Sequence, residues 1–138
     1  MNEFEFDTIY IGLQTSFTID IDEGKMTSFL AITSDINPLH TDAKFAISKG
    51  FKDKVTYGML SASFYSTLVG VYLPGRYSVL HGLNIQFMQP VYAGDTLTII
   101  GEVVFINEYY KQIEIKATII NQDKTKVSKA LIKVGITK

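Results

Sequence analysis

The stretch of sequence that decides the fold runs from Val55 to Gly75 and reads VTYGMLSASFYSTLVGVYLPG. It carries no charged residue over 21 positions, about the length that crosses a bilayer. Five serines and threonines, three glycines and a proline interrupt it, however, and the flanks lack strong basic runs. We therefore expect a helix that starts at Tyr57 or Gly58, is closed by Gly70, Pro74 and Gly75, and is buried on all sides by its own protein.

The sequence after this helix has the periodicity of strands. Residues 77–89 contain no acid, lysine or arginine, which predicts a strand buried on both faces. Apolar residues then recur at every second position, as in strands with one wet face; they are Leu97, Ile99, Val103 and Phe105, then Ile113, Ile115, Ala117 and Ile119, then Ala130, Ile132, Val134 and Ile136. The same alternation over residues 15–21 predicts a first strand.

These elements favour an α+β fold with one antiparallel sheet and with helices in the first half of the chain. Only the concave side of a twisted sheet offers enough apolar surface to cover an apolar helix, so we expect the sheet to curl around it. An open sheet leaves an edge strand that a second copy can cover by pairing with it. We therefore expect a homodimer with its sheets joined edge to edge. A higher oligomer is compatible with this expectation.

Capping residues predict short helices before the uncharged stretch. Asp22 is a plausible N-cap for an amphipathic helix that ends near Ser34. Residues 35–41 are expected to form a loop, because Pro38 disfavours helical backbone in the residue before it. Asp42 begins a second short helix, which Gly50 ends.

Composition excludes several classes of function. The 138 residues suit a single domain, expected over 1–138, and a net charge of −1 gives no sign of affinity for nucleic acid or a membrane surface. No cysteine is present, which excludes disulfides and thiolate chemistry. The N-terminal residues are acidic rather than basic, so we expect a cytoplasmic protein.

The residues best suited to chemistry lie in the run Asp35-Ile36-Asn37-Pro38-Leu39-His40. Pro38 stiffens the loop and Asn37 can bond its own backbone, so the Asp35 carboxylate and the His40 imidazole form a candidate acid/base pair. The other histidine, His81, lies within an apolar strand pattern and is expected to be structural.

Other kinds of site lack their required residues. The run does not match a calcium-binding loop, because His40 stands where the turn glycine of such a loop belongs. A zinc site would need a second histidine nearby, and the sequence has none there. A Gly-x-Ser-x-Gly elbow and the glycine-rich nucleotide motifs are also missing. We expect no metal and no cofactor. Gly58, at the start of the long helix, instead offers a free backbone N–H to a carbonyl oxygen that gains negative charge.

Three motifs in this order resemble the MaoC-like, or R-specific enoyl-CoA hydratase, family of the hot-dog fold. They are Asp35-Ile36-Asn37-Pro38-Leu39-His40, then Gly58-Met59-Leu60, then Pro90-Val91-Tyr92-Ala93-Gly94-Asp95-Thr96-Leu97. The resemblance extends from about Thr15 to Ile136, although the Gly-Asp turn is shared with thioesterases. It implies a sheet wrapped around a central helix, here Gly58 to Tyr72, an edge-joined dimer and a hydro-lyase of fatty-acid metabolism.

The resemblance also implies a reaction, namely water addition to a trans-2-enoyl thioester of coenzyme A or acyl carrier protein, or the reverse dehydration. Asp35 and His40 would activate the water, while the Gly58 N–H would polarise the thioester carbonyl. Asn37 would hold the loop, and Ser66 would help to line the site.

One residue departs from the family pattern, because Tyr57 stands where many members have histidine before the Gly-Met pair. The resemblance therefore does not assign the Tyr57 side chain a contact with the substrate. Two other functions also stay open. One is a non-catalytic acyl-thioester-binding module, and the other is an acyl thioesterase, which would use a carboxylate on the central helix, where residues 58–72 have none.

Overall fold

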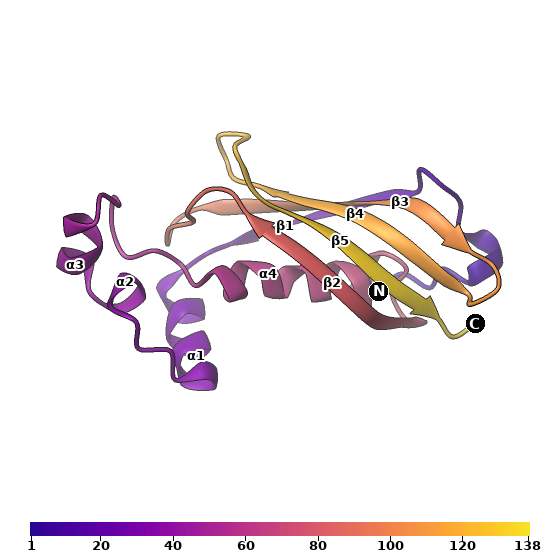
Figure 1. Cartoon of the computed structure of the whole chain (residues 1–138), viewed down its shortest axis with the longest axis horizontal. Helices are drawn as coiled ribbons and strands as arrows, with labels where there is room; N and C mark the ends of the chain where they lie inside the picture. The colour runs from indigo at the N-terminus through magenta and orange to yellow at the C-terminus, as the bar shows by residue number, and fades with distance from the viewer.

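The computed structural model describes all 138 residues (Figure 1). A sheet lies against one side of the long helix, and three short helices lie beyond that helix's N-terminal end. In chain order the elements are η1 (Phe6–Thr8), β1 (Gln14–Asp20), α1 (Glu23–Thr33), α2 (Pro38–Thr41), α3 (Ala43–Ser48), α4 (Gly58–Thr67), η2 (Leu68–Tyr72), β2 (Ser78–Phe87), β3 (Thr96–Asn107), β4 (Gln112–Ile120) and β5 (Lys126–Ile136).

All five strands form one sheet in the order β1-β3-β4-β5-β2, and every neighbouring pair is antiparallel. The strands β3, β4 and β5 follow each other directly, whereas β2 joins the far side of β5 and becomes an edge. Alternate residues of β4, such as Ile113 and Ile115, are fully buried, as the two-residue periodicity predicts. The predicted α+β class and antiparallel sheet are confirmed.

The core lies between the sheet and the long helix. Tyr65 and Leu68 on the helix, and Leu97 and Ile99 on β3, are at most 1% exposed. Gly101 on β3 lets the helix approach closely, because a Cβ at this position would clash with the Leu68 side chain. Burial of side chains of this size stabilises a fold by roughly 1.5–3 kcal/mol each, so this contact holds the helix against the sheet.

The long helix begins at Gly58 and ends at Tyr72, as predicted, but its last five residues form the π-helical turn η2. It is not buried on all sides, and that part of the prediction is wrong for the single chain. Met59 is 61% exposed and Ser63 and Ser66 are exposed, because the sheet covers only one side of α4. No helix is long and apolar enough to cross a membrane.

The strand β2 also differs from the prediction, because it is an edge strand rather than one buried on both faces. Its apolar side chains Val79, Leu80, Leu83 and Phe87 are 41–53% exposed, since no element of this chain covers them. His81 is exposed too, and its Nδ1 lies 2.8 Å from the Gln112 side-chain nitrogen. This contact agrees with a structural role for His81.

One residue of β3 faces the opposite way from the prediction. The alternation placed Phe105 on the buried face with Val103, but the pairing with β4 shifts between these two residues. A bulge adds one residue and moves every later side chain to the other face. Phe105 is consequently 49% exposed, while Ile106 packs against the core.

The short helices follow their caps. The Asp22 side chain accepts a hydrogen bond from Lys25 N at 2.8 Å, and Asp42 caps α3 through Phe45 N at 3.1 Å. The expected loop over 35–41 is wrong in its second half, where Pro38 starts the four-residue helix α2. Proline is well suited to a first helical position because its missing N–H would have no partner there.

Candidate active site

Asp35 precedes the four-residue helix α2, and His40 lies within it. The Asn37 side chain accepts a hydrogen bond from Leu39 N at 2.9 Å and so caps α2. Asp35 Oδ1 in turn accepts the N–H of Asn37 at 3.1 Å. These two local bonds explain why Asn37 precedes the proline, and they fix the backbone that carries both candidate catalytic residues.

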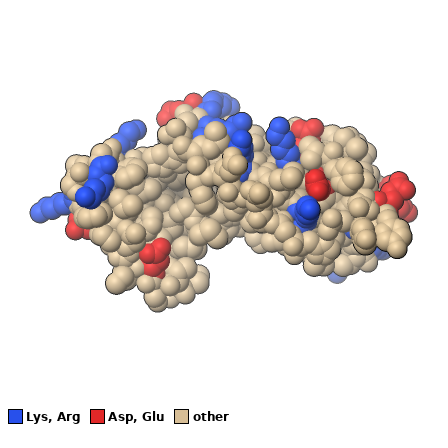
Figure 2. Space-filling model, viewed as in Figure 1, with Lys and Arg blue, Asp and Glu red and all other residues tan.

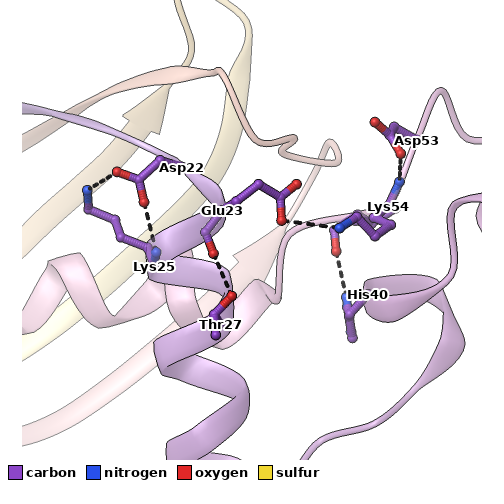
Figure 3. Close-up of polar contacts among 8 residues, drawn as sticks. Asp22, Glu23, Lys25, Thr27, His40, Asp53 and Lys54 are labelled. Carbon is purple, nitrogen blue, oxygen red and sulfur yellow. Dashed lines mark hydrogen bonds and ion pairs between the residues drawn. The ribbon is translucent and has the colours of Figure 1, made fainter.

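The His40 ring is held by one backbone contact. Its Nδ1 lies 2.7 Å from the carbonyl oxygen of Val55, and Figure 3 draws this contact as the dashed line above His40. A carbonyl oxygen only accepts hydrogen bonds, so Nδ1 carries the proton in the neutral ring and Nε2 keeps its lone pair. The arrangement leaves Nε2 as the atom that can accept a proton.

Tyr57 joins the two candidate residues. Its ring is buried and its centroid lies 4.2 Å from that of the His40 imidazole, with 33° between the planes. Its hydroxyl donates a hydrogen bond to the Asp35 backbone carbonyl at 3.0 Å. Phe29 of α1 packs on the same ring at 5.0 Å. One buried side chain therefore touches both halves of the proposed acid/base pair.

The environment keeps the Tyr57 hydroxyl protonated. Burial raises its pKa above the usual value of 10.0, and the negative charge of Asp35 raises it further, while Lys54 acts in the opposite sense. At neutral pH the hydroxyl is therefore a neutral donor, as its bond to the Asp35 carbonyl requires.

Gly58 begins α4 immediately after Tyr57. The Tyr57 side chain does not cap the helix, and the N–H of Gly58 donates to no acceptor in the chain. Such a group at a helix N-terminus carries partial positive charge. It lies one residue from the aromatic ring that contacts His40.

A largely apolar cavity of about 300 Å³ reaches this N-terminus. Its walls come from the segment before α4, the end of β2 with the turn that follows, and the start of β5; the lining residues include Phe51, Val55, Gly58, Phe87, Val91 and Val127. The cavity contains the residue whose carbonyl binds His40, but neither Asp35 nor His40 lines it.

One ion pair and one turn keep this region in place. Lys54 Nζ lies 3.1 Å from Glu23 Oε2 and links α1 to the segment before α4 (Figure 3). On the sheet side, Asp95 accepts hydrogen bonds from Tyr92 N and from the Gln122 side chain, both at 2.9 Å. The Gly-Asp turn of the third motif thus has a structural role, joining the turn before β3 to the turn before β5.

The structure brings Asp35, Asn37, His40, Tyr57 and Gly58 together, but not Ser66. Ser66 is exposed, two turns along α4 from Gly58, and does not line the cavity. Sequence reasoning missed Val55, whose carbonyl orients His40, because a backbone acceptor leaves no signal in residue type. No cluster of three or more His, Asp or Glu side chains of the kind that holds a metal ion is present.

Comparison with known proteins shows which family the chain resembles. Residues 8–125 match the family described as MaoC like domain. An (R)-specific enoyl-CoA hydratase of Aeromonas caviae is 34% identical over 73% of this chain and 75% of that protein. One from Rhodospirillum rubrum is also 34% identical, over 67% of this chain and just under two thirds, 65%, of its own length.

Solved structures give the same result. An unliganded R-hydratase from Pseudomonas aeruginosa superimposes with a TM-score of 0.92 at 26% identity, over 99% of this chain and 87% of that one. The (R)-hydratase from A. caviae superimposes with a TM-score of 0.89 at 29% identity, over 94% and 98%. From its sequence match and its fold, this chain belongs to the MaoC-like dehydratase family, whose members are hydro-lyases, and has (R)-specific enoyl-CoA hydratases among its relatives.

Proposed function

We propose that this protein is an (R)-specific enoyl-thioester hydratase, which also catalyses the reverse dehydration of a (R)-3-hydroxyacyl thioester. The observation that carries the proposal is the contact of Tyr57 with both Asp35 and His40, immediately before the free N–H of Gly58. A base, a carboxyl group and an oxyanion donor are the groups that water addition next to a thioester requires.

One water is shared between the two side chains, and the Asp35 carboxylate accepts a hydrogen bond from it. His40 Nε2 accepts a proton from this water as the water oxygen bonds to C3 of the enoyl group. The imidazolium then gives that proton to C2, which leaves both side chains as they began. Water thus contributes a hydroxyl to C3 and, after this transfer, one proton to the product. The Nδ1 contact with Val55 supports this role of Nε2.

The Gly58 N–H stabilises the charge that develops during addition. As C3 gains oxygen, electron density moves onto the thioester oxygen in an enolate-like state. A donor that is already oriented at a helix N-terminus needs no reorganisation to bind that oxygen, and removal of one such donor typically lowers kcat about 10²–10³-fold.

The test measures loss of the enoyl absorbance of trans-2-enoyl thioesters of several lengths, presented on coenzyme A and on acyl carrier protein. Chiral chromatography of the released 3-hydroxy acid checks the (R) configuration. Asp35→Asn and His40→Ala should each lower kcat about 10²–10⁴-fold, while the thermal unfolding temperature stays close to that of the wild type.

The second histidine provides the matched control. His81 is exposed on β2 and contacts only the Gln112 side chain among polar partners, so His81→Ala should retain the wild-type rate. Wild-type protein inactive on both carriers would reject the hydratase proposal and favour a non-catalytic acyl-binding module. Free-thiol release would favour a thioesterase, although α4 carries no carboxylate for that reaction.

We also propose that two copies form a homodimer through β2. The outer edge of β2 has no partner strand, and its apolar side chains, including Leu83, are partly exposed. Pairing of two β2 edges would satisfy the free backbone groups and cover those side chains, since such an edge otherwise invites uncontrolled association.

Light scattering coupled to gel filtration tests this assembly. Leu83→Lys should give a monomer, because two lysines would be buried near each other at the symmetric edge. The matched control is Leu131→Lys on β5, because Leu131 and Leu83 are both 41% exposed but Leu131 lies away from the edge. A monomeric wild type, or a dimer that persists in Leu83→Lys, would contradict an interface at β2.

A further inference from the structure

The carbonyl that orients His40 belongs to a peptide group with two hydrogen bonds. Its C=O, from Val55, accepts the proton of His40 Nδ1 at 2.7 Å. Its N–H, from Thr56, donates to the Val91 carbonyl, also at 2.7 Å. The peptide is trans, so its C=O and N–H point to opposite sides of one rigid plane. The orientation of the His40 ring therefore depends on where the Val91 carbonyl lies.

A second peptide group continues this connection. The Val91 C=O and the Tyr92 N–H belong to the same trans peptide, and the N–H donates to Asp95 Oδ2 at 2.9 Å. Three hydrogen bonds thus join the His40 imidazole to the Asp95 carboxylate through two peptide groups. We call these three bonds the His40–Asp95 series.

All bonds of the series run in the same direction. His40 Nδ1, Thr56 N and Tyr92 N each donate to the next acceptor, and the last acceptor is a carboxylate. Hydrogen bonds that follow one another in this way polarise each other, and a bond to a charged acceptor is stronger than one to a neutral acceptor. Thr56 and Val91 are buried, so water does not compete for the middle bond. The series therefore favours the tautomer of His40 in which Nδ1 keeps its proton.

The carboxylate at the end of the series has a fixed position. Its second oxygen, Oδ1, accepts the Gln122 side chain at 2.9 Å. The Asp95 carbonyl accepts Ile21 N at 2.9 Å, and the N–H of Gly94 donates to the Ile21 carbonyl at 2.7 Å. Because Ile21 is part of the core, the turn that carries Asp95 is tied to the body of the protein.

No ion pair neutralises the Asp95 carboxylate. The ion pairs of the chain use other carboxylates, namely Glu3, Glu5, Asp22, Glu23 and Glu114. Lys52 Nζ lies over the Tyr92 ring, 5.9 Å from its centroid, but forms no ion pair with Asp95. In Figure 1 both segments of the series lie between α3 and the sheet, and on the face drawn in Figure 2 this part of the surface is mostly uncharged. The negative charge therefore remains available to polarise the series.

We propose that Asp95 is a positioning residue for the hydration reaction. Its carboxylate, acting through the two peptide groups, holds the His40 ring with Nδ1 protonated and Nε2 ready to take a proton from water. The inference rests on the proposed function for its effect on the rate, and it gives the Gly-Asp turn a part in the same site. Asp95 itself does not line the cavity that contains Gly58, so it acts only through other groups.

NMR of protein labelled with nitrogen-15 histidine tests the series directly. The sequence has two histidines, so His40→Ala assigns the signals. In the wild type the His40 Nδ1 proton should resonate downfield and exchange slowly, as in a strong hydrogen bond. Asp95→Asn keeps an acceptor for Tyr92 N but removes the charge, so this proton should move upfield. Asp95→Ala should also raise its exchange rate several-fold, because the series then lacks its last acceptor.

The hydration assay measures the effect on the rate. The kcat for enoyl thioesters should fall several-fold in Asp95→Asn. It should fall about tenfold or more in Asp95→Ala, because a small displacement of a reacting group has a large effect on the rate. The loss should appear mainly in kcat rather than in KM, since Asp95 does not line the cavity.

Asp20→Ala is the matched control. Asp20 Oδ1 accepts the Thr96 hydroxyl at 2.7 Å, so the variant removes a carboxylate bonded to the residue next to Asp95 but leaves Tyr92 N with its acceptor. It should keep the wild-type kcat and His40 signal even if its unfolding temperature falls. A change of the His40 signal as large as that in Asp95→Asn would overturn the proposal, because a general loss of stability would then explain both.

The NMR measurement also separates this proposal from the hydratase proposal. If Asp95→Ala does not fold, Asp95→Asn decides alone, and an unchanged His40 Nδ1 signal or an unchanged kcat overturns the proposal. If the wild type hydrates no enoyl thioester, the hydratase function fails. The His40 signal of the free protein then still shows whether Asp95 holds the ring, because it needs no substrate.

Discussion

The Tyr57 ring lies against the His40 imidazole, with 4.2 Å between their centroids, while the Tyr57 hydroxyl binds the Asp35 carbonyl at 3.0 Å. These two contacts use different parts of one side chain. The ring limits the rotation of His40, and the hydroxyl limits the movement of the backbone that carries Asp35. Tyr57 is therefore a positioning residue, which acts through the two groups that we propose to be catalytic.

Two substitutions separate these contacts. Tyr57→Phe keeps the ring beside His40 and loses only the hydrogen bond, so kcat should fall about two- to tenfold, in line with the net value of one such bond. Tyr57→Leu loses the ring as well and should lower kcat by a further factor of about ten, because His40 would no longer be held. KM should change little in either variant.

Steady-state kinetics and thermal unfolding check this order of effects. The matched control is Tyr72, which stacks on Phe17 at 4.5 Å at the other end of the long helix. Tyr72→Leu should lower the unfolding temperature without lowering kcat. A Tyr57→Phe variant as slow as Tyr57→Leu would show that the ring has no separate part in positioning His40.

Loss of the α2 cap should reduce activity more than stability. Asn37→Ala removes the side-chain acceptor of Leu39 N and should lower the free energy of unfolding by about 1 kcal/mol. Because α2 also carries His40 and follows Asp35, kcat should fall about tenfold or more. Urea denaturation and the hydration assay measure the two effects.

Asp22→Ala is the control for the cap, because it removes the side-chain acceptor of Lys25 N and so uncaps α1 in the same way. It should lower stability by a similar amount, about 1 kcal/mol, with kcat near the wild-type value. An equal loss of kcat in both variants would mean that helix capping in general, rather than the position of α2, controls the rate.

Gly58→Ala should narrow the cavity. A Cβ at this position would lie 3.2 Å from the Phe87 ring, which must then move. Phe87 is about half exposed, so the cost in stability should be less than the ~1–3 kcal/mol typical of overpacked cores. The N–H remains, and KM for enoyl thioesters should rise several-fold because Gly58 and Phe87 both line the cavity.

Gly70→Ala gives the comparison within the same long helix, since a Cβ there meets no atom within 4 Å. It should raise stability slightly through helix propensity, by about 0.5–1 kcal/mol, and leave KM unchanged. An unchanged KM in Gly58→Ala would contradict the use of this cavity by the substrate.

Tyr65 predicts how stability depends on alkaline pH. Burial raises its pKa from 10.0 to about 12, although its hydrogen bond with Ser128 acts in the opposite sense. The folded protein thus keeps a proton that the unfolded chain loses, so this stabilisation is complete below pH 10 and is lost as pH rises to 12. The free energy of unfolding should fall by roughly 1 kcal/mol between about pH 9 and pH 11 from this group alone.

Urea denaturation at both pH values checks the slope. Tyr65→Phe should be less stable at pH 9, because Ser128 loses its partner, but its stability should fall less on going to pH 11. Tyr109→Phe, at an exposed tyrosine, should keep the wild-type slope. The same slope in Tyr65→Phe and the wild type would contradict the assignment.

Local features of the fold were predictable from the sequence. Asp22 caps a helix because its side chain reaches an N–H three residues later, and β4 alternates because strand geometry turns each side chain to the opposite face. The exposure of β2 was not predictable, since an apolar strand looks the same whether its cover comes from its own chain or from outside it. The bulge before Phe105 was also missed, because one added residue has no clear signal.

The candidate site divides in the same way. Asp35 and His40 are close in sequence, so a short stiff turn was enough to predict them as a pair. Which nitrogen of the His40 ring is free was not predictable, because it depends on the Val55 carbonyl, 15 residues away, and on how the chain returns past α2.

The amino-acid order alone was thus sufficient for the class of fold, the long uncharged helix and the carboxyl and imidazole groups beside it, because periodicity, caps and short turns act over a few residues. The folded chain decided which side of the helix is covered, which nitrogen of His40 is free, and that Tyr57 holds both groups. Those outcomes depend on contacts between distant segments, whose geometry is set only when the helix packs against the sheet.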